Sequence, residues 1–245
     1  MNISVILPVY NEEKTINKVI STLLEKVNDL LEVIVVNDGS TDSTGVICQE
    51  AQANNPIVRY IMLPENKGKT AALKEGIKKS RGDIVIVQDA DLEYDPFEIN
   101  AVVDPIQTGV ADVVLGSRFL VRKTSRSLYF RHYMANRFIS FLSNLFTDLN
   151  LSDVETCYKA FRGDIIRNMI ITSRRFGFEI EVVAKIAKLK CRVYEVPISY
   201  YGRSYEEGKK IGLGDGIMAL FYIFKYNLLT SKKASFQDHF SIERS

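Results

Sequence analysis

Two carboxylates follow a short apolar run, and their spacing suits the binding of a cation. Asp89 and Asp91 come directly after Ile84–Val87, four β-branched residues with the length and composition of a buried strand. Residues two apart in extended backbone point to the same side, so these carboxylates repel each other unless a cation lies between them. Oxygen ligands suit Mg²⁺ or Mn²⁺, which proteins commonly hold with one or two carboxylates and a substrate's phosphates. A solvated turn is the alternative that this pair alone leaves open.

The neighbouring segments favour the metal site. Apolar runs alternate with helical patterns through the first half of the chain, which predicts a parallel, doubly wound α/β sheet. The expected strands are residues 3–7, 33–36, 58–63, 84–87 and 111–116. In such a sheet the carboxyl ends of the strands share one edge, where ligands bind. The polar residues expected to converge there are Tyr10, Asn11, Glu12, Asp38, Asn66, Lys67, Asp89, Asp91 and Arg118.

Two common nucleotide-binding motifs are missing from the sequence. Gly68-Lys69-Thr70 is similar to the end of a P-loop, but Leu63 stands where that loop requires glycine. The glycines at 212, 214 and 216 lack the G-x-G-x-x-G spacing and follow no predicted strand. Neither a P-loop NTPase nor a dinucleotide-dependent dehydrogenase is therefore expected.

Length and composition set further bounds. The 245 residues fit one large α/β domain, and the net charge of +2 gives no sign of nucleic-acid binding. The three cysteines lie far apart without metal-ligand spacing, which suits a reducing cytosol. The first residues read as a strand rather than a signal peptide, and no apolar run is long enough to predict a membrane-spanning helix.

A basic, aromatic segment opens the second half. Residues 118–137 contain no acidic residue, and 128–146 read as a helix with an aromatic, apolar face. The basic residues of the segment are Arg118, Arg122, Lys123, Arg126, Arg131 and Arg137. It is either an ordinary helix with a solvated basic side or a surface for an anionic acceptor or membrane. Arg118 and Arg131 are the favoured phosphate ligands, because guanidinium groups pair with phosphate oxygens in a forked geometry.

The remaining segments carry a second set of candidates. Asp153 and Glu155 form another carboxylate pair, which includes a general base or caps the next turn. Residues 178–187 read as an amphipathic helix, and 193–200 as a strand that Pro197 places at a sheet edge. The 201–210 loop is a solvated linker or a lid that brings Arg203 and Lys209 onto a diphosphate. The apolar helix expected at 211–229 is too polar to span a bilayer and could lie on one.

Four motifs in order give the chain a family resemblance. They are Pro8-Val9-Tyr10-Asn11-Glu12, Asn37-Asp38-Gly39-Ser40-Thr41-Asp42, Asn66-Lys67-Gly68-Lys69 and Asp89-Ala90-Asp91. Together they resemble an inverting family 2 glycosyltransferase with the GT-A fold. The second half resembles the polyprenyl-phosphate branch, as in dolichyl-phosphate mannose synthase. The pieces that match are Gly116-Ser117-Arg118, the Arg131 region, Ser152-Asp153 ahead of Tyr158-Lys159-Ala160-Phe161-Arg162, and Val196-Pro197-Ile198 leading to Arg203 and Lys209.

The resemblance covers about residues 1–228 and implies a single Rossmann-like GT-A domain. Residues 1–120 would form the nucleotide-sugar and metal half, and 121–228 the acceptor half with its C-terminal amphipathic helix. Residues 229–245 would form a polar tail.

The resemblance also implies a role for individual residues. Asp89 and Asp91 would hold Mg²⁺ or Mn²⁺ and the diphosphate, with Glu93, where the family pattern has Gln, as a third metal ligand. Arg131 would meet the acceptor phosphate and, with Asp89, Asp91 and Arg118, make up the catalytic set. The residues expected to bind the donor are Pro8, Tyr10, Glu12, Val36 in the base pocket, Asp38, Lys67, Asp89, Ala90, Asp91, Arg118, Arg203 and Lys209.

The implied activity is transfer of a hexose from GDP-mannose or a UDP-sugar to a polyprenyl phosphate, dolichyl or undecaprenyl, at the membrane surface. The enzyme would be cytoplasmic and peripheral on the cytoplasmic membrane face, with room for a small integral-membrane partner. Two alternatives stay open. One is transfer to a sugar hydroxyl in polysaccharide or glycolipid synthesis, with Asp153 or Glu155 as the base. The other is an inactive subunit that binds nucleotide-sugar.

Overall fold

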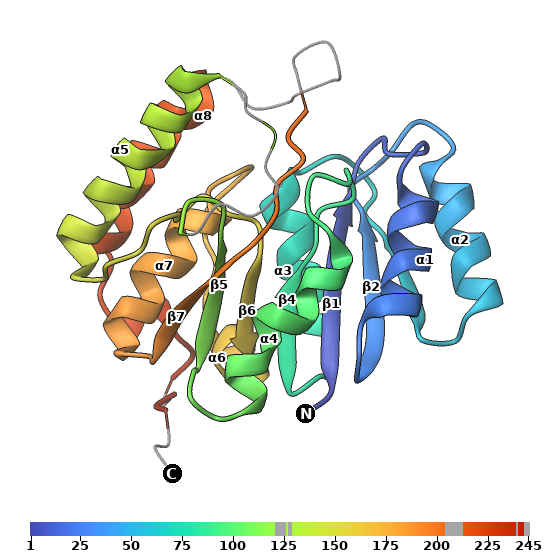
Figure 1. The fold of residues 1–245 in the computed structure, drawn as a ribbon, viewed down its shortest axis with the longest axis horizontal. Coiled ribbons are helices and arrows are strands. Elements are labelled where there is room, and N and C mark those ends of the chain that lie inside the picture. The colour runs from blue at the N-terminus through green and yellow to red at the C-terminus, as the bar shows by residue number, and fades with distance from the viewer. Residues whose placement is uncertain (121–125, 127–128, 204–212, 239, 243–245) are drawn as a thin grey trace.

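A computed structural model describes residues 1–120, 126, 129–203, 213–238 and 240–242. A seven-stranded sheet runs through the described chain in the order β3-β2-β1-β4-β6-β5-β7, with helices on both faces (Figure 1). The strands are β1 (Ile3–Val9), β2 (Leu30–Asn37), β3 (Val58–Met62), β4 (Ile84–Val87), β5 (Val113–Ser117), β6 (Lys159–Arg162) and β7 (Val193–Pro197). The predicted mostly parallel, doubly wound sheet is confirmed.

The central strands are buried because their sequences are continuously apolar. All seven residues of β1 are buried, and β1 pairs in parallel with β2 on one side and β4 on the other. Val5 marks the register, since it lies opposite Val33 in β2 and Ile86 in β4. A strand covered on both faces needs such a run rather than an alternating pattern. These parallel pairings bring the carboxyl ends of β1, β2 and β4 to one edge.

Among the strands of the described chain, β6 was not predicted. It inserts between β4 and β5 and pairs antiparallel with both. Its first residue, Lys159, is fully buried, and the ammonium donates to the backbone carbonyls of Val154 and Thr156. Strand β7 lies at the sheet edge, parallel to β5, so the predicted edge position is confirmed.

The helices are α1 (Ile16–Lys26), α2 (Thr44–Asn54), α3 (Lys69–Lys79), α4 (Ile99–Gln107), α5 (Phe130–Thr147), α6 (Gly163–Asn168), α7 (Phe178–Leu189) and α8 (Leu213–Phe224). Helices α5 and α7 match the predicted helices at 128–146 and 178–187 to within two residues, whereas α6 was not predicted. A 3₁₀ turn η1 (Pro96–Glu98) precedes α4, a π-helical turn η2 (Lys225–Leu229) continues α8, and a second 3₁₀ turn η3 (Lys233–Ser235) lies in the tail. Arg122, Lys123 and Lys209 lie outside the described residues.

Helices α5 and α8 lie side by side on one flank of the sheet (Figure 1). The rings of Phe146 and Phe224 meet edge to face, with centroids 5.3 Å apart. Both helices also contact α7, which lies between them and the sheet. Within the described ranges, every helix is too short or too polar to cross a bilayer.

Candidate active site

Asp89 and Asp91 lie just past the end of β4, and each faces a cation from elsewhere in the chain. The Asp89 carboxylate pairs with the Lys69 ammonium at 2.8 Å. The Asp91 carboxylate pairs with the Arg203 guanidinium at 2.7 Å. Burial raises the pKa of Asp91 to about 7, and the negative charges of Asp89 and Glu93 add to this effect. The two aspartates are therefore close enough to repel each other, as the sequence predicted.

Lys69 is a site residue to which the sequence analysis gave no role. It is the first residue of α3, and its ammonium bridges Asp89 to Glu179, at 3.0 Å, on the first turn of α7. Burial opposes its charge, yet the carboxylates of Asp89 and Glu179 raise the pKa of Lys69 well above its usual value. Lys69 follows Gly68 at the start of a predicted helix, next to the sheet edge where the polar residues converge. This position is the sequence signal that could have identified Lys69 as a site residue.

Arg203 joins the ends of three strands. Besides Asp91, its Nε contacts Glu93 at 3.2 Å and its Nη1 lies 3.7 Å from Glu12, which follows β1. The backbone amide of Arg203 donates to Glu93 at 2.9 Å, and the Tyr200 hydroxyl donates to the same carboxylate at 2.9 Å. These contacts bring residues after β1, β4 and β7 into one cluster.

The pair of aspartates fits a divalent cation, although a third protein ligand is not assembled. Their ligating atoms are all oxygens, and the negative charge that raises the Asp91 pKa is what a bound cation would neutralise. Among the described residues, no group of three His, Cys, Asp or Glu side chains is arranged to hold a metal. Glu93 is occupied by Tyr200 and Arg203, so its role as a metal ligand stays a prediction. Two carboxylates and substrate phosphates would complete such a site.

Asp38 organises the neighbouring loop. It is buried at the end of β2 and accepts hydrogen bonds from the backbone amides of Lys67 and Gly68, at 2.8 and 2.7 Å. Gly39 follows with φ +72°, and a Cβ there would lie 2.8 Å from the Asn66 amide nitrogen. Only glycine allows this close approach at that backbone angle. Asp38 thus fixes the loop at residues 67–68, which directly precedes Lys69 and so helps to place its ammonium next to Asp89.

The other predicted donor residues differ in accessibility. Tyr10 and Lys67 are exposed and Glu12 is partly exposed at this edge, whereas Pro8 and Ala90 are buried. Val36 is fully buried, and its side chain packs beneath α3 next to Gly76. This position does not support its predicted place in the base pocket, because α3 covers that face of the sheet.

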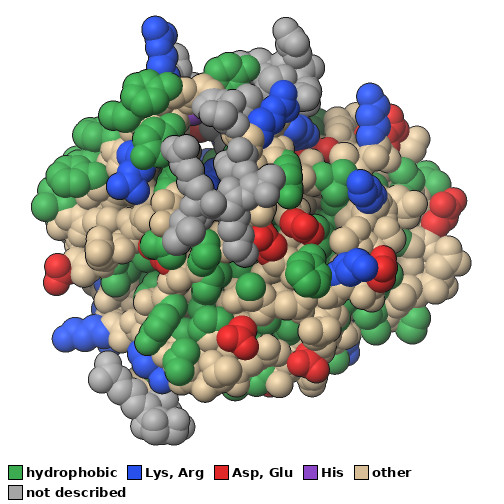
Figure 2. Space-filling view, in the orientation of Figure 1, with side chains coloured by type: hydrophobic (Ala, Val, Ile, Leu, Met, Phe, Trp, Pro, Cys, Tyr) green, Lys and Arg blue, Asp and Glu red, His purple; other side chains and the backbone are tan. Residues whose placement is uncertain are grey.

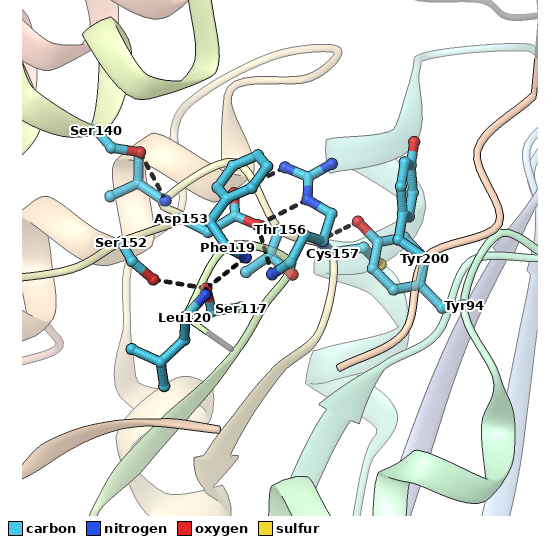
Figure 3. Close-up of polar contacts among 12 residues, drawn as sticks. Tyr94, Ser117, Phe119, Leu120, Ser140, Ser152, Asp153, Thr156, Cys157 and Tyr200 are labelled. Atoms are coloured by element: carbon cyan, nitrogen blue, oxygen red, sulfur yellow. Dashed lines mark hydrogen bonds and ion pairs between the residues drawn. The ribbon is translucent and has the colours of Figure 1, made fainter. Parts of the chain in front are cut away.

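The Arg118 side chain points inward to Asp153. Its Nε and Nη2 bond the two carboxylate oxygens at 2.6 and 2.7 Å, and its guanidinium lies 5.0 Å from the centre of the Tyr200 ring. Figure 3 shows Asp153 near the hydrogen-bonded hydroxyls of Ser117 and Ser152. The Asp153 side chain is fully buried and the Arg118 side chain is 10% exposed, so both oxygens of Asp153 are engaged in this ion pair. The predicted phosphate contact of Arg118 would have to use its remaining N–H groups.

A second polar cluster lies beneath this pair. One oxygen of Glu155 and one of Glu179 are buried without a hydrogen-bond partner in the described part of the chain. Burial raises the pKa of Glu155 to about 7, and the Glu179 charge contributes. Glu155 is therefore the better placed of the two predicted bases to exchange a proton near neutral pH.

The predicted acceptor residues lie further out. Arg131 is exposed on the first turn of α5. Arg137, six residues further along α5, donates from its guanidinium to the backbone carbonyl of Ser152 at 3.2 Å. Helix α5 therefore contacts the segment that carries Asp153.

Family comparison decides among the classes that this geometry allows. Residues 4–170 match the profile of glycosyl transferase family 2. The chain belongs to that family. Its resemblance to family 2, stated from the motifs, is thereby confirmed.

Two curated relatives show the branch. The chain is 30% identical over 232 residues to the undecaprenyl-phosphate 4-deoxy-4-formamido-L-arabinose transferase of Edwardsiella ictaluri, covering 93% of this chain and 67% of the relative. It is 28% identical over 222 residues to the undecaprenyl-phosphate mannosyltransferase of Micrococcus luteus, covering 86% and 88%. The predicted similarity to the polyprenyl-phosphate branch is confirmed by both.

Solved structures agree on the fold. Glucosyl-3-phosphoglycerate synthase from Mycobacterium tuberculosis, in complex with Mn²⁺ and UDP-glucose, superposes with a TM-score of 0.71 at 21% identity. The match covers 92% of this chain and 79% of that one. The same synthase with Mg²⁺ and UDP gives 0.71 at 22% identity, with the same coverage. The predicted GT-A fold is confirmed by these neighbours.

Proposed function

We propose that this family 2 enzyme moves a hexose from a nucleoside-diphosphate sugar to a polyprenyl phosphate, with inversion at the anomeric carbon. The observation that carries the proposal is the pair Asp89 and Asp91 at the carboxyl edge of the sheet. Asp89 forms an ion pair with the Lys69 side chain, and Asp91 with the Arg203 side chain. The acceptors named for the two curated relatives support the lipid phosphate.

Asp89 and Asp91 would hold Mg²⁺ or Mn²⁺ against the donor diphosphate. When bound, the cation supplies charge neutralisation for the departing diphosphate. Arg203 lies close enough to Asp91 to contact the donor phosphates after a change of rotamer. Lys209 is proposed to contact the same diphosphate. Asp38 would position the loop beneath the nucleoside, with Tyr10 exposed beside it.

The acceptor phosphate needs no general base. Its second pKa is about 6, so an oxygen is already anionic at neutral pH. That oxygen attacks the anomeric carbon, and the bonding electrons of the broken C–O bond leave with the diphosphate. Basic side chains must hold the nucleophile instead, and Arg131 is proposed for this role. The ion pair between Asp153 and Arg118 agrees with this mechanism, in which Asp153 does not act as a base.

A sugar hydroxyl is the second candidate acceptor, and Glu155 is the observation that favours it. A carboxyl whose pKa is raised to about 7 suits a general base at neutral pH. Glu155→Gln would then abolish transfer to a hydroxyl acceptor, while transfer to a lipid phosphate would survive. Arg131→Ala should impair the lipid phosphate reaction more.

The proposal includes peripheral contact with the cytoplasmic face of the membrane, because a polyprenyl chain keeps its phosphate at the bilayer surface. A small integral-membrane partner is compatible with this arrangement.

The test is a donor panel of UDP- and GDP-sugars with undecaprenyl or dolichyl phosphate, in Mg²⁺ or Mn²⁺. The expected result is sugar that extracts with the lipid, and loss of about 10²-fold or more of the rate in Asp89→Asn and Asp91→Asn. Release of pyrophosphate with a new nucleotide–sugar bond would instead identify a nucleotidyltransferase. Absence of both transfer and donor hydrolysis across the panel would identify an inactive binding subunit.

A further inference from the structure

Tyr200, which follows β7, contacts two sides of the candidate site, and its ring makes the first contact. The ring packs against Tyr94, with centroids 5.4 Å apart, and the Arg118 guanidinium lies over it, 5.0 Å from its centroid. Figure 3 shows the two tyrosine rings next to each other. A guanidinium over the face of an aromatic ring is attracted by the electrons of the ring. The ring therefore restrains Arg118 in addition to the ion pair with Asp153.

The hydroxyl group of Tyr200 reaches a second arginine through Glu93. It donates to Glu93 Oε2 at 2.9 Å, while Glu93 Oε1 accepts from the backbone amide and from Nε of Arg203, at 2.9 and 3.2 Å. The terminal nitrogens of Arg203 face other carboxylates, with Nη2 at 2.7 Å from Asp91 and Nη1 at 3.7 Å from Glu12. Glu93 thus holds the inner part of Arg203, and the end of the guanidinium lies beside the proposed cation ligand Asp91.

The backbone on both sides of Tyr200 is fixed to the segment between β4 and α4. The Tyr201 amide donates to the Glu93 carbonyl at 2.9 Å. The Glu98 carboxylate in η1 accepts from the amide and the hydroxyl of Ser199, at 2.7 and 3.2 Å. Because both neighbours of Tyr200 are bonded in this way, the fold itself sets the direction of the tyrosine side chain.

A role in packing alone does not account for both contacts. Packing explains the Tyr200 ring against Tyr94, but it does not explain a hydroxyl that bonds Glu93, a carboxylate that already binds Arg203. Figure 2 shows basic and acidic side chains gathered along the upper edge of the molecule, where the parallel strands in Figure 1 end. At such an edge, the orientation of each guanidinium depends on the groups that hold it.

We propose that Tyr200 is a positioning residue for two arginines that contact the donor diphosphate. Its ring orients Arg118, and its hydroxyl orients Arg203 through Glu93. The proposal rests on the proposed function and on the phosphate contacts predicted for both arginines, and it adds the residue that fixes their geometry relative to each other. Arg118 follows β5 and Arg203 follows β7, so the two guanidinium groups belong to separate segments that share Tyr200. Without Tyr200 each arginine would have more rotamers to lose when it binds a phosphate.

Nucleotide binding tests this role, because a diphosphate reports on the arginines and a nucleoside does not. UDP and GDP are titrated in Mn²⁺, each beside uridine or guanosine. Tyr200→Phe keeps the ring and removes the hydroxyl, so diphosphate binding should weaken by about three- to tenfold through Arg203 alone. Tyr200→Leu also removes the ring and should weaken diphosphate binding by about ten- to thirtyfold. Nucleoside binding should stay the same in both variants.

The neighbouring tyrosine provides the matched control. Tyr201 is 46% exposed, and Tyr201→Phe and Tyr201→Leu should bind the diphosphate like the wild type. If the Tyr200 variants lose nucleoside and diphosphate affinity equally, Tyr200 only packs, and the inference is wrong. Wild-type diphosphate affinity in the Tyr200 variants would overturn it as well. Tyr200→Phe alone decides the question if Tyr200→Leu does not fold.

Double variants assign each part of the side chain to its arginine. In an Arg203→Met background, Tyr200→Phe should cause no further loss of diphosphate affinity, because the hydroxyl acts on a charge that is gone. In an Arg118→Met background, Tyr200→Phe should keep its full effect, and Tyr200→Leu should weaken binding no more than Tyr200→Phe does. Additive losses of Tyr200→Phe and Arg203→Met would contradict the route through Glu93.

Transfer to polyprenyl phosphate separates a failure of this inference from a failure of the proposed function. If the wild type forms glycosylated lipid while the Tyr200 variants bind the diphosphate normally, the inference is wrong and the function right. If the variants lose diphosphate affinity as expected but no lipid is glycosylated, the positioning role stands and the proposed acceptor is wrong. Failure of the wild type to bind either UDP or GDP would overturn both.

Discussion

At the level of single residues, the metal-binding candidates are held by protein cations. Asp89 has Lys69 and Asp91 has Arg203, because a partly buried carboxylate without a counter-charge is costly. A divalent cation would compete with these side chains for the same oxygens. Lys69 is bound by two carboxylates and its side chain is 15% exposed, whereas Arg203, which follows β7, is bound by three and is 22% exposed.

Replacing Arg203 should therefore change the affinity for free metal. Arg203→Met is expected to bind Mn²⁺ about three- to tenfold more tightly without donor, the equivalent of roughly 1 kcal/mol for a partly exposed ion pair. The measurement is titration followed by electron paramagnetic resonance at pH 8.5, where protons compete less for Asp91. Lys79→Met, an exposed change of equal charge, is the control. Weaker or unchanged Mn²⁺ binding by the Arg203 variant would show that the arginine does not compete with metal.

Glu155 should make stability depend on pH. Its pKa is raised from 4.5 to about 7 by burial and by Glu179, so the folded state keeps a proton that the unfolded state has lost between these values. The free energy of unfolding should then fall as pH rises across that window, by at most about 1.4 kcal/mol per pH unit. Above pH 7 the penalty is complete and the dependence levels off.

Urea unfolding of wild type and Glu155→Gln between pH 5 and 8 measures this contribution. The amide does not ionise, so the variant should gain stability relative to wild type as pH rises. Glu50→Gln, on the exposed side of α2, is expected to track wild type. A pH-independent difference between Glu155→Gln and wild type would contradict the raised pKa.

At the level of elements, the predictable parts are those whose patterns are local. Strands β1, β2 and β4 are recognisable in the sequence as apolar runs followed by polar turns. Strand β7 is recognisable as an alternating run that contains a proline. Strand β6 does not, because its buried Lys159 is satisfied by backbone carbonyls five and three residues earlier in the chain. Sequence pattern treats a lysine as a surface residue, so it cannot foresee a lysine whose partners are fixed by tertiary structure.

The same limit applies to the candidate site. The order of the strands explains why Glu12, Asp38, Asp89 and Asp91 could be placed at one edge from sequence. The pairing of Arg118 with Asp153 could not be foreseen, because it depends on how the segment before β6 packs against the end of β5. The sequence therefore offered Asp153 as a base and Arg118 as a phosphate ligand, while the structure binds each to the other.

Breaking that pair should weaken the junction between β5 and β6. Asp153→Asn leaves the Arg118 guanidinium, whose side chain is only 10% exposed, without its counter-charge, and loss of one partner of a largely buried ion pair costs about 3–5 kcal/mol. Urea unfolding should show this loss, while Asp104→Asn on the exposed side of α4 should change stability little. Full stability with lost activity would instead return Asp153 to a role in catalysis.

At the level of the whole molecule, the sheet edge combines ligands from both halves of the chain. Asp89 and Asp91 come from the first half, Arg203 and Glu179 from the second, and their contacts cross the sheet. Binding of donor and metal should therefore stabilise the fold as a unit, because a ligand that binds only the folded state shifts the unfolding equilibrium.

Thermal unfolding with UDP or GDP, in Mn²⁺ or in chelator, turns this linkage into an assay for the donor. A nucleotide at 100 times its dissociation constant adds about 2.7 kcal/mol. For a chain of this size that corresponds to a rise in Tm of roughly 5–10 °C. Only the nucleotide with the correct base should reach this value, and only with Mn²⁺, if Asp89 and Asp91 bind the cation and diphosphate as proposed. Asp91→Asn should lose the Mn²⁺-dependent part of the shift and keep any part due to the nucleoside. Equal shifts in chelator and in Mn²⁺ would mean that the diphosphate binds without the two aspartates, and the proposed metal site would have to be abandoned.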